Sequence, residues 1–284
     1  MSNTFTIGRH GSFQLRYGWI TKGIQAVQKR DSTKKLADVF ISDDATVNLG
    51  VGKNMVAAIR YWLIATKVMN NDSITRFGKF LNEKDAYLED DASLWLLHLT
   101  LAQNKKLATS IYWLFNHFHQ NEFSAEEAGG AFLSYARENN WKGSEKTLRM
   151  DIQVILRMYA PHKSAKTQIE DMLESPLSLL GLIKYFDGRY HFSFSPKNTP
   201  IEVIAHNIND KFKDDKTVSI QDLMYGDNAV APALKIREDE LIAILEKITQ
   251  KYDDYHLRED AGIFQLHKSI TTDTYKYLEK YYAA

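Results

Sequence analysis

The 284-residue sequence contains no cysteine and no long run of apolar residues. The first absence excludes disulfides, thiolate metal ligands and cysteine nucleophiles. The second argues against a membrane-spanning helix, because no stretch approaches the ~18 apolar residues that such a helix needs. The first residues, MSNTFTIGRHGSF, also lack the apolar core of a signal peptide. We therefore expect a cytoplasmic protein with no membrane partner.

Net charge is also absent, because 36 Lys and Arg side chains balance 36 Asp and Glu side chains. The balance is uneven along the chain. Residues 1–70 contain ten basic and four acidic side chains, a net charge of +6, so the remainder carries −6. A basic N-terminal third on a neutral protein indicates a localised surface for a polyanion such as double-stranded DNA.

The central feature of this basic region is a helix that the periodicity predicts from about residue 52 to residue 66. One side of it collects the residues of a core stripe, namely Met55, Val56, Ile59, Trp62, Leu63 and Thr66. The other side carries the candidate DNA-binding residues, namely Lys53, Asn54, Arg60, Tyr61 and Lys67. An α-helix enters the major groove only where nothing bulky holds it off, and Ala57 and Ala58 permit that approach. An ordinary amphipathic helix with a solvated basic side is the alternative.

The order of elements around this helix predicts a winged helix-turn-helix unit over residues 1–83. Helices are expected over residues 12–30 and 32–39, before the helix at 52–66. The turn-forming residues after Met69 then indicate a tight hairpin. Three helices followed by a hairpin is the order of a winged helix-turn-helix.

A second winged-helix-like unit is expected over residues 124–196, after a helical connecting core over residues 84–123. Ser124 and Glu127 have the spacing of a capping box. A helix follows from Ser144, and its outer side carries three more candidate DNA-binding residues, Lys146, Arg149 and Arg157. A hairpin turned at Asp187-Gly188 places the last candidate, Arg189, near the tip of the wing. The alternative is a hairpin that packs on the helices and a basic side that is only solvated.

Residues 197–284 complete the expected architecture as a mainly helical C-terminal domain. An amphipathic helix is expected over residues 238–252, and a Tyr-rich helix ends the chain. The expected fold class is therefore mainly α, with tandem winged-helix-like units, small β-hairpin wings and a helical C-terminal domain.

The glycine-rich segment LGVGKN does not match a phosphate-binding loop. Such a loop needs a glycine five residues before its Gly-Lys pair, and this position is Val47. It also needs Ser or Thr after the lysine to hold magnesium, and this position is Asn54. We therefore expect no nucleotide cofactor.

Three side chains near the N-terminus suit contact with a phosphodiester. His10, Arg16 and Tyr17 crowd into one glycine-rich segment. Arg and His can hold a phosphate, and Tyr can hydrogen-bond or attack one. The alternative is that the aromatic residues of this segment belong to the core around the first helix.

Carboxylates gather at the start of the connecting core. Glu89, Asp90 and Asp91 form the best local group. Carboxylate and water ligands suit Mg²⁺ or Mn²⁺, and the chain has no cysteine for other metals. These three residues are therefore the candidate metal ligands, with a solvated helix start as the alternative.

Six segments carry a resemblance to a known family. They are HGSFQLRYGWITKG, VNLGVGKNMVAAIRYWL, LEDDASLWLLHL, WLFNHF, SEKTLRMDI and AGIFQL, and they run in order from His10 to Leu266. Together they resemble a bacterial family of proteins with a domain of unknown function, found beside DNA phosphorothioation genes. The family includes the B component of Ssp-type systems, in which sulfur replaces a backbone oxygen of DNA.

The resemblance implies a DNA-binding protein of a modification and anti-phage system that nicks one strand so that modification can proceed. His10, Arg16 and Tyr17 would then be the catalytic set, and Glu89, Asp90 and Asp91 would hold the metal. The sequence leaves open whether the fold brings the two sets together. The implied partners are double-stranded DNA and the sulfur-transfer and ATPase components of the system, and a homodimer stays open. Two alternatives stay open: a non-catalytic adaptor that recruits the sulfur-transfer machinery, and a transcriptional regulator.

Overall fold

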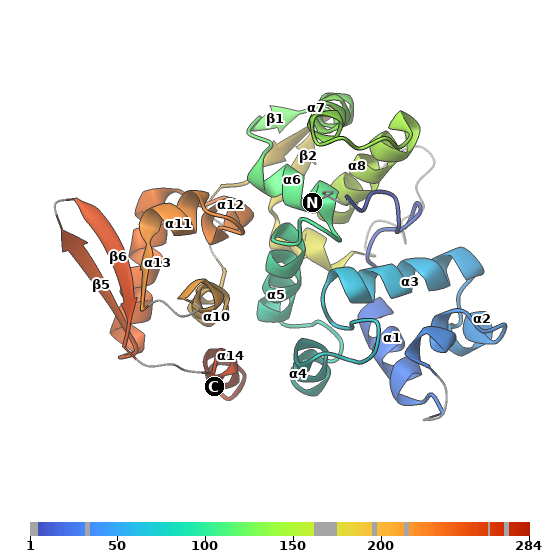
Figure 1. Cartoon of the computed structure of the whole chain (residues 1–284), viewed down its shortest axis with the longest axis horizontal. Coiled ribbons are helices and arrows are strands. Elements are labelled where there is room, and N and C mark those ends of the chain that lie inside the picture. The colour runs from blue at the N-terminus through green and yellow to red at the C-terminus, as the bar shows by residue number, and fades with distance from the viewer. Residues whose placement is uncertain are drawn as a thin grey trace. The chain divides into compact units, whose positions relative to one another are not determined.

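The computed structural model describes residues 5–31, 35–161, 175–194, 198–212, 216–260, 262–269 and 273–284. The chain divides into two compact units, Met1–Phe192 and Ser193–Ala284 (Figure 1). The expected boundaries inside the first unit, after residues 83 and 123, stay predictions. The expected boundary between residues 196 and 197 touches positions outside the described residues.

The N-terminal part of the first unit contains four short helices. They are α1 (Trp19–Gln28), η1 (Leu36–Phe40), α2 (Ala45–Leu49) and α3 (Lys53–Ala65). The helix expected at 52–66 is confirmed as α3, and α1 confirms the later part of the helix expected at 12–30. The segment expected as a helix at 32–39 begins outside the described residues and ends in η1, a 3₁₀ turn. Periodicity gives no indication of α2, a helix too short to show it.

The inner side of α3 is the centre of this region because its side chains are almost fully buried. Ile59 and Trp62 have no exposed surface. The expected core stripe is confirmed except at Met55, which is half-buried. The Nε1 of Trp62 also donates to the carbonyl of Phe13 at 3.2 Å. This bond ties α3 to the chain that precedes α1.

The chain after α3 forms another helix rather than a wing. The helix α4 (Arg76–Lys84) begins after its N-cap Thr75. In this fully described stretch the hairpin is reduced to one antiparallel bridge, between Met69 and Ile74. The expected wing of the first region is therefore corrected to a single bridge and a helix, because the apolar residues from Phe77 to Leu81 recur at helical spacing.

The rest of the first unit surrounds a three-stranded antiparallel sheet. Its elements are α5 (Asp91–Ala102), α6 (Thr109–Asn116), β1 (Glu122–Phe123), α7 (Ala125–Glu138), α8 (Glu145–Tyr159), η2 (Pro176–Leu180), β2 (Ile183–Phe186) and β3 (Arg189–Phe192). The strands lie in the order β1–β3–β2, with Glu122 opposite His191 and Ile183 opposite Phe192. The helices expected in the connecting core are confirmed as α5 and α6.

Local sequence sets the ends of these elements as expected. The N–H of Glu127 donates to Ser124 Oγ at 3.1 Å, and the N–H of Ser124 donates to Glu127 Oε2 at 2.6 Å, which completes the capping box of α7. Ser144 caps α8. Asp187 and Gly188 turn the β2–β3 hairpin at φ values of 51° and 77°. A two-residue turn of this kind requires that left-handed conformation, so the hairpin prediction is confirmed.

The second unit contains a sheet that the sequence pattern does not predict. Its elements are α10 (Ile201–Phe212), β4 (Thr217–Ser219), α11 (Ile220–Tyr225), α12 (Val230–Leu234), α13 (Glu238–Lys251), β5 (Tyr255–Asp260), β6 (Ile263–Lys268) and α14 (Tyr275–Tyr282). The strands lie in the order β4–β6–β5 (Figure 1). The unit is mainly helical, as expected, but it also contains this small sheet. The sequence pattern does not predict strand β5, because its last residues, from Arg258 to Asp260, are all exposed. They therefore do not alternate between apolar and polar side chains.

The two units share one order of elements. In each, a helix leads to a short strand, further helices and a hairpin, and the short strand pairs with the last strand. The helices before the two hairpins differ in charge, because α8 carries cations outward whereas α13 begins with Glu238, Asp239 and Glu240. Within the part of the chain that the structure describes, no helix has the length and apolar character needed to cross a membrane.

Truncating Trp62 should destabilise the first unit. Trp62→Ala leaves a cavity at a fully buried position and removes the bond to Phe13, so we expect a loss of ~3–5 kcal/mol in the free energy of unfolding. Val47→Ala, at a side chain that is 80% exposed, is the matched control and should change it by less than about 0.5 kcal/mol. Urea unfolding followed by circular dichroism measures both. Equal stability of the two variants would contradict the core position of Trp62.

Candidate nucleic-acid interface

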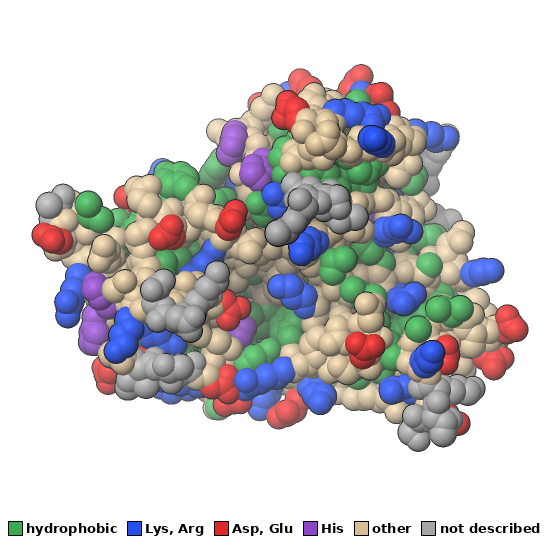
Figure 2. All heavy atoms as spheres, in the orientation of Figure 1, with side chains coloured by type: hydrophobic (Ala, Val, Ile, Leu, Met, Phe, Trp, Pro, Cys, Tyr) green, Lys and Arg blue, Asp and Glu red, His purple; other side chains and the backbone are tan. Residues whose placement is uncertain are grey.

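The outer side of α3 presents expected DNA-binding side chains to solvent. Lys53, Asn54 and Ala57 are exposed, and Arg60 is half-buried. Lys67 is also exposed and follows the helix in a left-handed conformation, at φ 56°. Figure 2 shows Lys and Arg side chains spread over the face of the first unit that carries α3. Because only a methyl group projects at position 57, an approaching groove meets no bulky side chain there. Ala58, the other alanine expected on this side, is instead buried, because it faces the core.

Tyr61 lies on the same helix, but its hydroxyl is engaged within the protein. It donates to the carbonyl of Leu107, between α5 and α6, at 2.7 Å. Burial, and to a smaller degree the Asp151 carboxylate, raises the pKa of Tyr61 well above its usual value. The hydroxyl therefore stays protonated and supports α3 from the side.

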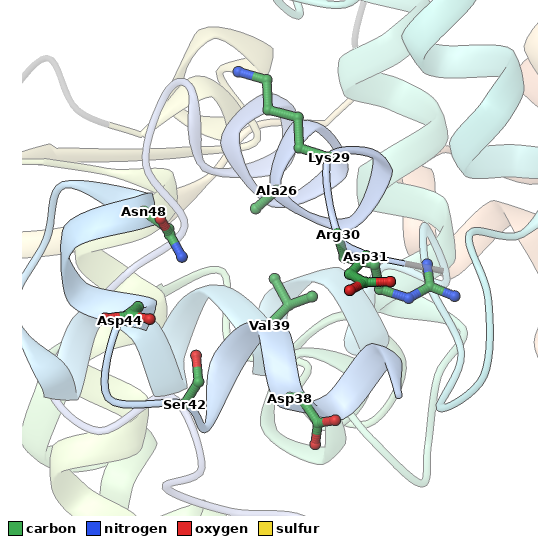
Figure 3. Close-up of a pocket in the computed structure, with 9 residues that line it drawn as sticks. All are labelled: Ala26, Lys29, Arg30, Asp31, Asp38, Val39, Ser42, Asp44 and Asn48. Carbon is green, nitrogen blue, oxygen red and sulfur yellow. The ribbon is translucent and has the colours of Figure 1, made fainter. Parts of the chain in front are cut away.

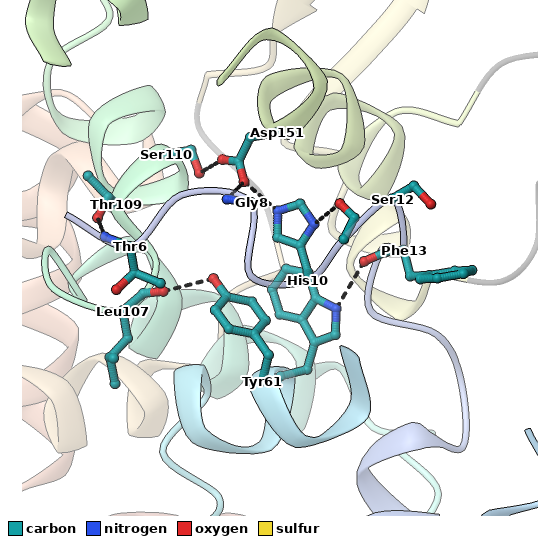
Figure 4. Close-up of polar contacts among 12 residues, drawn as sticks. Thr6, Gly8, His10, Ser12, Phe13, Tyr61, Leu107, Thr109, Ser110 and Asp151 are labelled. Atoms are coloured by element: carbon teal, nitrogen blue, oxygen red, sulfur yellow. Dashed lines mark hydrogen bonds and ion pairs between the residues drawn. The ribbon is translucent and has the colours of Figure 1, made fainter. Parts of the chain in front are cut away.

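A segment near the N-terminus runs between three helices (Figure 4). We call residues 6–13 the N-terminal brace. The N–H of Thr6 donates to Thr109 Oγ1 of α6 at 3.1 Å. The guanidinium of Arg157 on α8 reaches the carbonyl of Ser12 at 3.4 Å. Together with the bond from Trp62 to Phe13, these contacts join α3, α6 and α8 through one short stretch of chain.

Asp151 of α8 lies at the centre of the contacts of the brace. Its Oδ1 accepts the N–H of Gly8 at 2.6 Å and lies 2.7 Å from Nε2 of His10, while Oδ2 accepts the hydroxyl of Ser110. The Asp151 side chain is only 1% exposed, and a buried carboxylate is stable only where such partners satisfy it. Sequence reasoning missed Asp151, although one signal is present: a single acid stands on the apolar side of an amphipathic helix.

His10, one of the expected catalytic residues, connects α3 to α8. Its ring stacks on the Trp62 indole with centroids 5.4 Å apart and planes 10° apart. Its Nδ1 lies 3.0 Å from the carbonyl of Gly11, and its Nε2 faces Asp151. The His10 side chain is 1% exposed, so contact with DNA would require this segment to open. A catalytic role of His10 stays a prediction.

Arg16 and Tyr17, the other expected catalytic residues, precede α1. The Arg16 guanidinium lies 5.9 Å from the centre of the Phe13 ring and 5.7 Å from that of Trp19. Partial burial and the nearby Asp91 carboxylate raise the pKa of Tyr17. A raised pKa disfavours the phenolate that a tyrosine nucleophile needs. The structure does bring one residue of the expected metal set, Asp91, near one of the expected catalytic set.

The expected metal ligands Glu89, Asp90 and Asp91 lie at the start of α5. Asp90 is the N-cap, and its carboxylate accepts the N–H of Ala92 at 2.7 Å. Asp85 accepts the N–H groups of Glu89 and Asp90 at 2.9 and 3.0 Å. Among the residues that the structure describes, no three His, Asp or Glu side chains are placed to hold a metal ion. The donors as arranged do not fit a magnesium site, and capping accounts for the position of Asp90.

Two expected DNA-binding residues on α8 are exposed, Lys146 and Arg157. The third, Arg149, is half-buried, and its Nε lies 2.7 Å from Glu145 Oε1 one turn earlier. Such exposed pairs are weak, on the order of 0.3–0.5 kcal/mol, so a phosphate can displace the carboxylate. The outer side of α8 is therefore basic, though less so than its Lys and Arg content indicates.

Arg189, the expected wing residue, is held by two carboxylates. Its Nε lies 2.6 Å from Glu122 Oε1, and its Nη2 lies 2.9 Å from Glu127 Oε2. Local sequence patterns indicate neither partner. Glu127, for example, is 62 residues from Arg189 along the chain. The neighbourhood of Arg189 has a net negative charge, which opposes contact with a phosphate backbone.

A pocket of about 370 Å³ opens among α1, η1 and α2 (Figure 3). Its charged lining residues are of both signs: Lys29, Arg30, Asp31, Asp38 and Asp44. This mixture creates no field of one sign that would select a phosphate or a cation. None of the expected site residues lines this pocket.

The fold and the braced helix define a mainly helical protein with small antiparallel sheets and a basic, exposed helix side. The chain belongs to the DUF4007 family of proteins of unknown function, whose model matches residues 7–282. The family resemblance expected from the sequence is thereby confirmed. No curated protein matches the chain.

Two solved structures are similar to this chain. A crystal structure of SspB is 27% identical, with a TM-score of 0.85, and the match covers 99% of this chain and 90% of that chain. A crystal structure of magnesium-ion-bound SspB is 27% identical, with a TM-score of 0.83, and the match covers 98% of this chain and 88% of that chain. The fold is therefore SspB-like in both units.

Removing the Asp151 carboxylate should destabilise the first unit strongly. Asp151→Ala leaves the Gly8 N–H, the His10 ring and the Ser110 hydroxyl without their acceptor, so we expect a loss of about 3–5 kcal/mol in the free energy of unfolding. Asp43→Ala, at an exposed turn, is the control and should change it by less than about 0.5 kcal/mol. Denaturant titration at one pH compares them. An Asp151→Ala variant as stable as the control would show that the brace adds no stability.

Proposed function

We propose that this protein binds double-stranded DNA as a component of a DNA phosphorothioation and anti-phage defence system. The observation that carries the proposal is the outer side of α3, where Lys53, Asn54 and Arg60 surround the small Ala57. Similarity to SspB over nearly the whole chain, and the resemblance to the B component of Ssp-type systems, supply the context. The sulfur-transfer and ATPase components of such a system are the proposed protein partners.

The residue types on α3 suit the edges of base pairs in the major groove. An Asn side chain can make two hydrogen bonds to adenine, and Lys or Arg can contact guanine or a phosphate. The helix is a rigid platform for these groups because its inner side is core and its Tyr61 hydroxyl is tied to Leu107. In this proposal α3 reads the DNA, and the brace holds α3 from behind.

The part of the first unit from α6 to β3 would act as a winged-helix-like unit that adds backbone contacts. Its order of elements is that of a winged helix, with α8 in the place of the reading helix. Lys146 and Arg157 would contact phosphates, which position a protein on DNA but carry no sequence information. Arg189 could reach a phosphate only by leaving its two carboxylates, so we assign no DNA contact to the wing.

Nicking of one DNA strand is the second candidate function, and a non-catalytic adaptor is its rival. A similar protein, SspB, has a crystal structure with bound magnesium. The candidate residues are Arg16, Tyr17 and Asp91, and the Arg16 guanidinium would stabilise charge on a phosphate. A transcriptional regulator would instead bind one operator tightly, usually as a symmetric dimer.

Removing cations from α3 should weaken DNA binding without unfolding the protein. Lys53→Ala and Arg60→Ala should each lower the affinity for duplex DNA at least about fivefold. Each lost phosphate contact should also lower the slope of log affinity against log salt by about 0.9. Fluorescence anisotropy of a labelled duplex over a range of salt concentrations measures both quantities, and Lys247→Ala on α13 is the control.

Circular dichroism of each variant should match the native spectrum. If the double variant Lys53→Ala with Arg60→Ala bound as tightly as the native protein, with the same salt slope, α3 would be eliminated as the DNA contact.

Nicking predicts a specific pattern with supercoiled plasmid. The plasmid should convert to the open-circle form and stop there, and the reaction is compared with and without EDTA because the described residues offer no group that could hold a metal ion. Arg16→Ala should slow it about tenfold or more while DNA affinity is largely kept, because charge stabilisation acts on the transition state. Agarose gels follow the reaction, and a plasmid that stays supercoiled supports the adaptor. Nicking that survives EDTA would remove the metal from the mechanism, and a covalent protein–DNA adduct would contradict the raised pKa of Tyr17.

A further inference from the structure

The N-terminal brace touches both helices that the proposed function places on DNA. His10 stacks on Trp62 of α3 and pairs with Asp151 of α8, so one side chain lies between the two helices (Figure 4). The edge of the Tyr61 ring lies against the same imidazole, with centroids 5.6 Å apart. These contacts occupy the inner sides of α3 and α8 and leave their outer sides exposed.

Packing between these two helices is at most slight. α3 packs mainly on α1, α2 and η1, whereas α8 packs mainly on α6, α7, η2 and β2. Each backbone contact of the brace reaches one helix: the Gly8 N–H binds Asp151 of α8, and the Phe13 carbonyl binds Trp62 of α3. The side chain of His10 contacts both helices at once, in addition to the adjacent carbonyls of Ser12 and Phe13, which bind Arg157 of α8 and Trp62 of α3.

We propose that His10 is a positioning residue that fixes α3 relative to α8, so that both helices contact one DNA duplex as a rigid pair. This inference rests on the proposed function and extends it. It assigns His10 no contact with DNA, in agreement with a side chain that is 1% exposed. The partner it implies is a duplex long enough to meet both helices at once.

A rigid connection matters because the second contact with a duplex is intramolecular. Once α3 is bound, the effective concentration of α8 at the DNA falls as the connection between the helices loosens. A loosened α8 would then add little to the affinity, while the contribution of α3 persists. Fewer phosphates would be neutralised, so the salt dependence of binding would fall as well.

The test measures how much affinity for duplex DNA is lost when a cation on α8 is reversed. It makes this measurement with and without the His10 contact. Lys146→Glu reverses an exposed charge on α8 outside the brace, and in the otherwise native protein it should weaken duplex binding about tenfold and lower the salt slope by about 0.9. His10→Phe keeps an aromatic ring against Trp62 but cannot pair with Asp151. In that background Lys146→Glu should cost less than about twofold, because α8 is already disengaged.

A control separates this role from general stability. Thr21→Val removes a hydrogen bond to the carbonyl of Ala86, outside the brace, so Lys146→Glu should still cost about tenfold in that background. The same tenfold cost in the His10→Phe background would overturn the proposal and leave His10 a role in stability alone. If His10→Phe does not fold, His10→Gln replaces it, since its amide can still reach Asp151 but has no ring to stack on Trp62, and the same two outcomes decide.

Failure of this inference differs from failure of the proposed function. If duplex binding by the native protein did not respond to Lys53→Ala and Arg60→Ala, the proposed DNA contact itself would be overturned. Binding could instead depend on α3 while Lys146→Glu lowers the affinity equally in the native and the His10→Phe backgrounds. That result would overturn the positioning role alone.

Discussion

The first unit depends on the contacts of one buried carboxylate, that of Asp151. A carboxylate that is 1% exposed needs close partners, because an unpaired buried charge is strongly destabilising. Its partners are the N–H of Gly8, the ring of His10 and the hydroxyl of Ser110. Two of these belong to the N-terminal brace, so one buried charge fixes the path of the first residues along α8. The stack of His10 on Trp62 then extends that constraint to α3.

Charge separates the helix sides that suit DNA from those that do not. The outer side of α3 has Lys and Arg and no acid. In the hairpin of the first unit, by contrast, Arg189 is held by Glu122 of β1 and Glu127 of α7. The second unit repeats the order of elements found from α6 to β3. Its helix α13, which corresponds to α8, begins with three acids. One topology thus presents surfaces of different charge, and the proposed DNA contact follows the charge rather than the fold.

Local patterns predict the helices of this chain because each pattern lies within a few residues. The core stripe of α3, the capping box at Ser124 and the turn at Asp187-Gly188 are examples. Contacts across the chain were beyond such patterns: Gly8 and Asp151 are 143 residues apart, and nothing local pairs them. A residue type that suits catalysis or metal binding can also serve a structural purpose. The expected metal ligand Asp90 caps a helix, and the expected catalytic His10 is buried between two helices.

Placement of α3 in a groove of duplex DNA can be measured by crosslinking. A photoreactive residue in place of Ala57 lies in the middle of the exposed side of that helix. We predict a covalent product with duplex DNA, which unlabelled duplex competes away. The same photoreactive residue in place of Glu126, exposed on α7, should give none. If the protein bound the duplex but position 57 gave no product, α3 would not be the helix that contacts DNA.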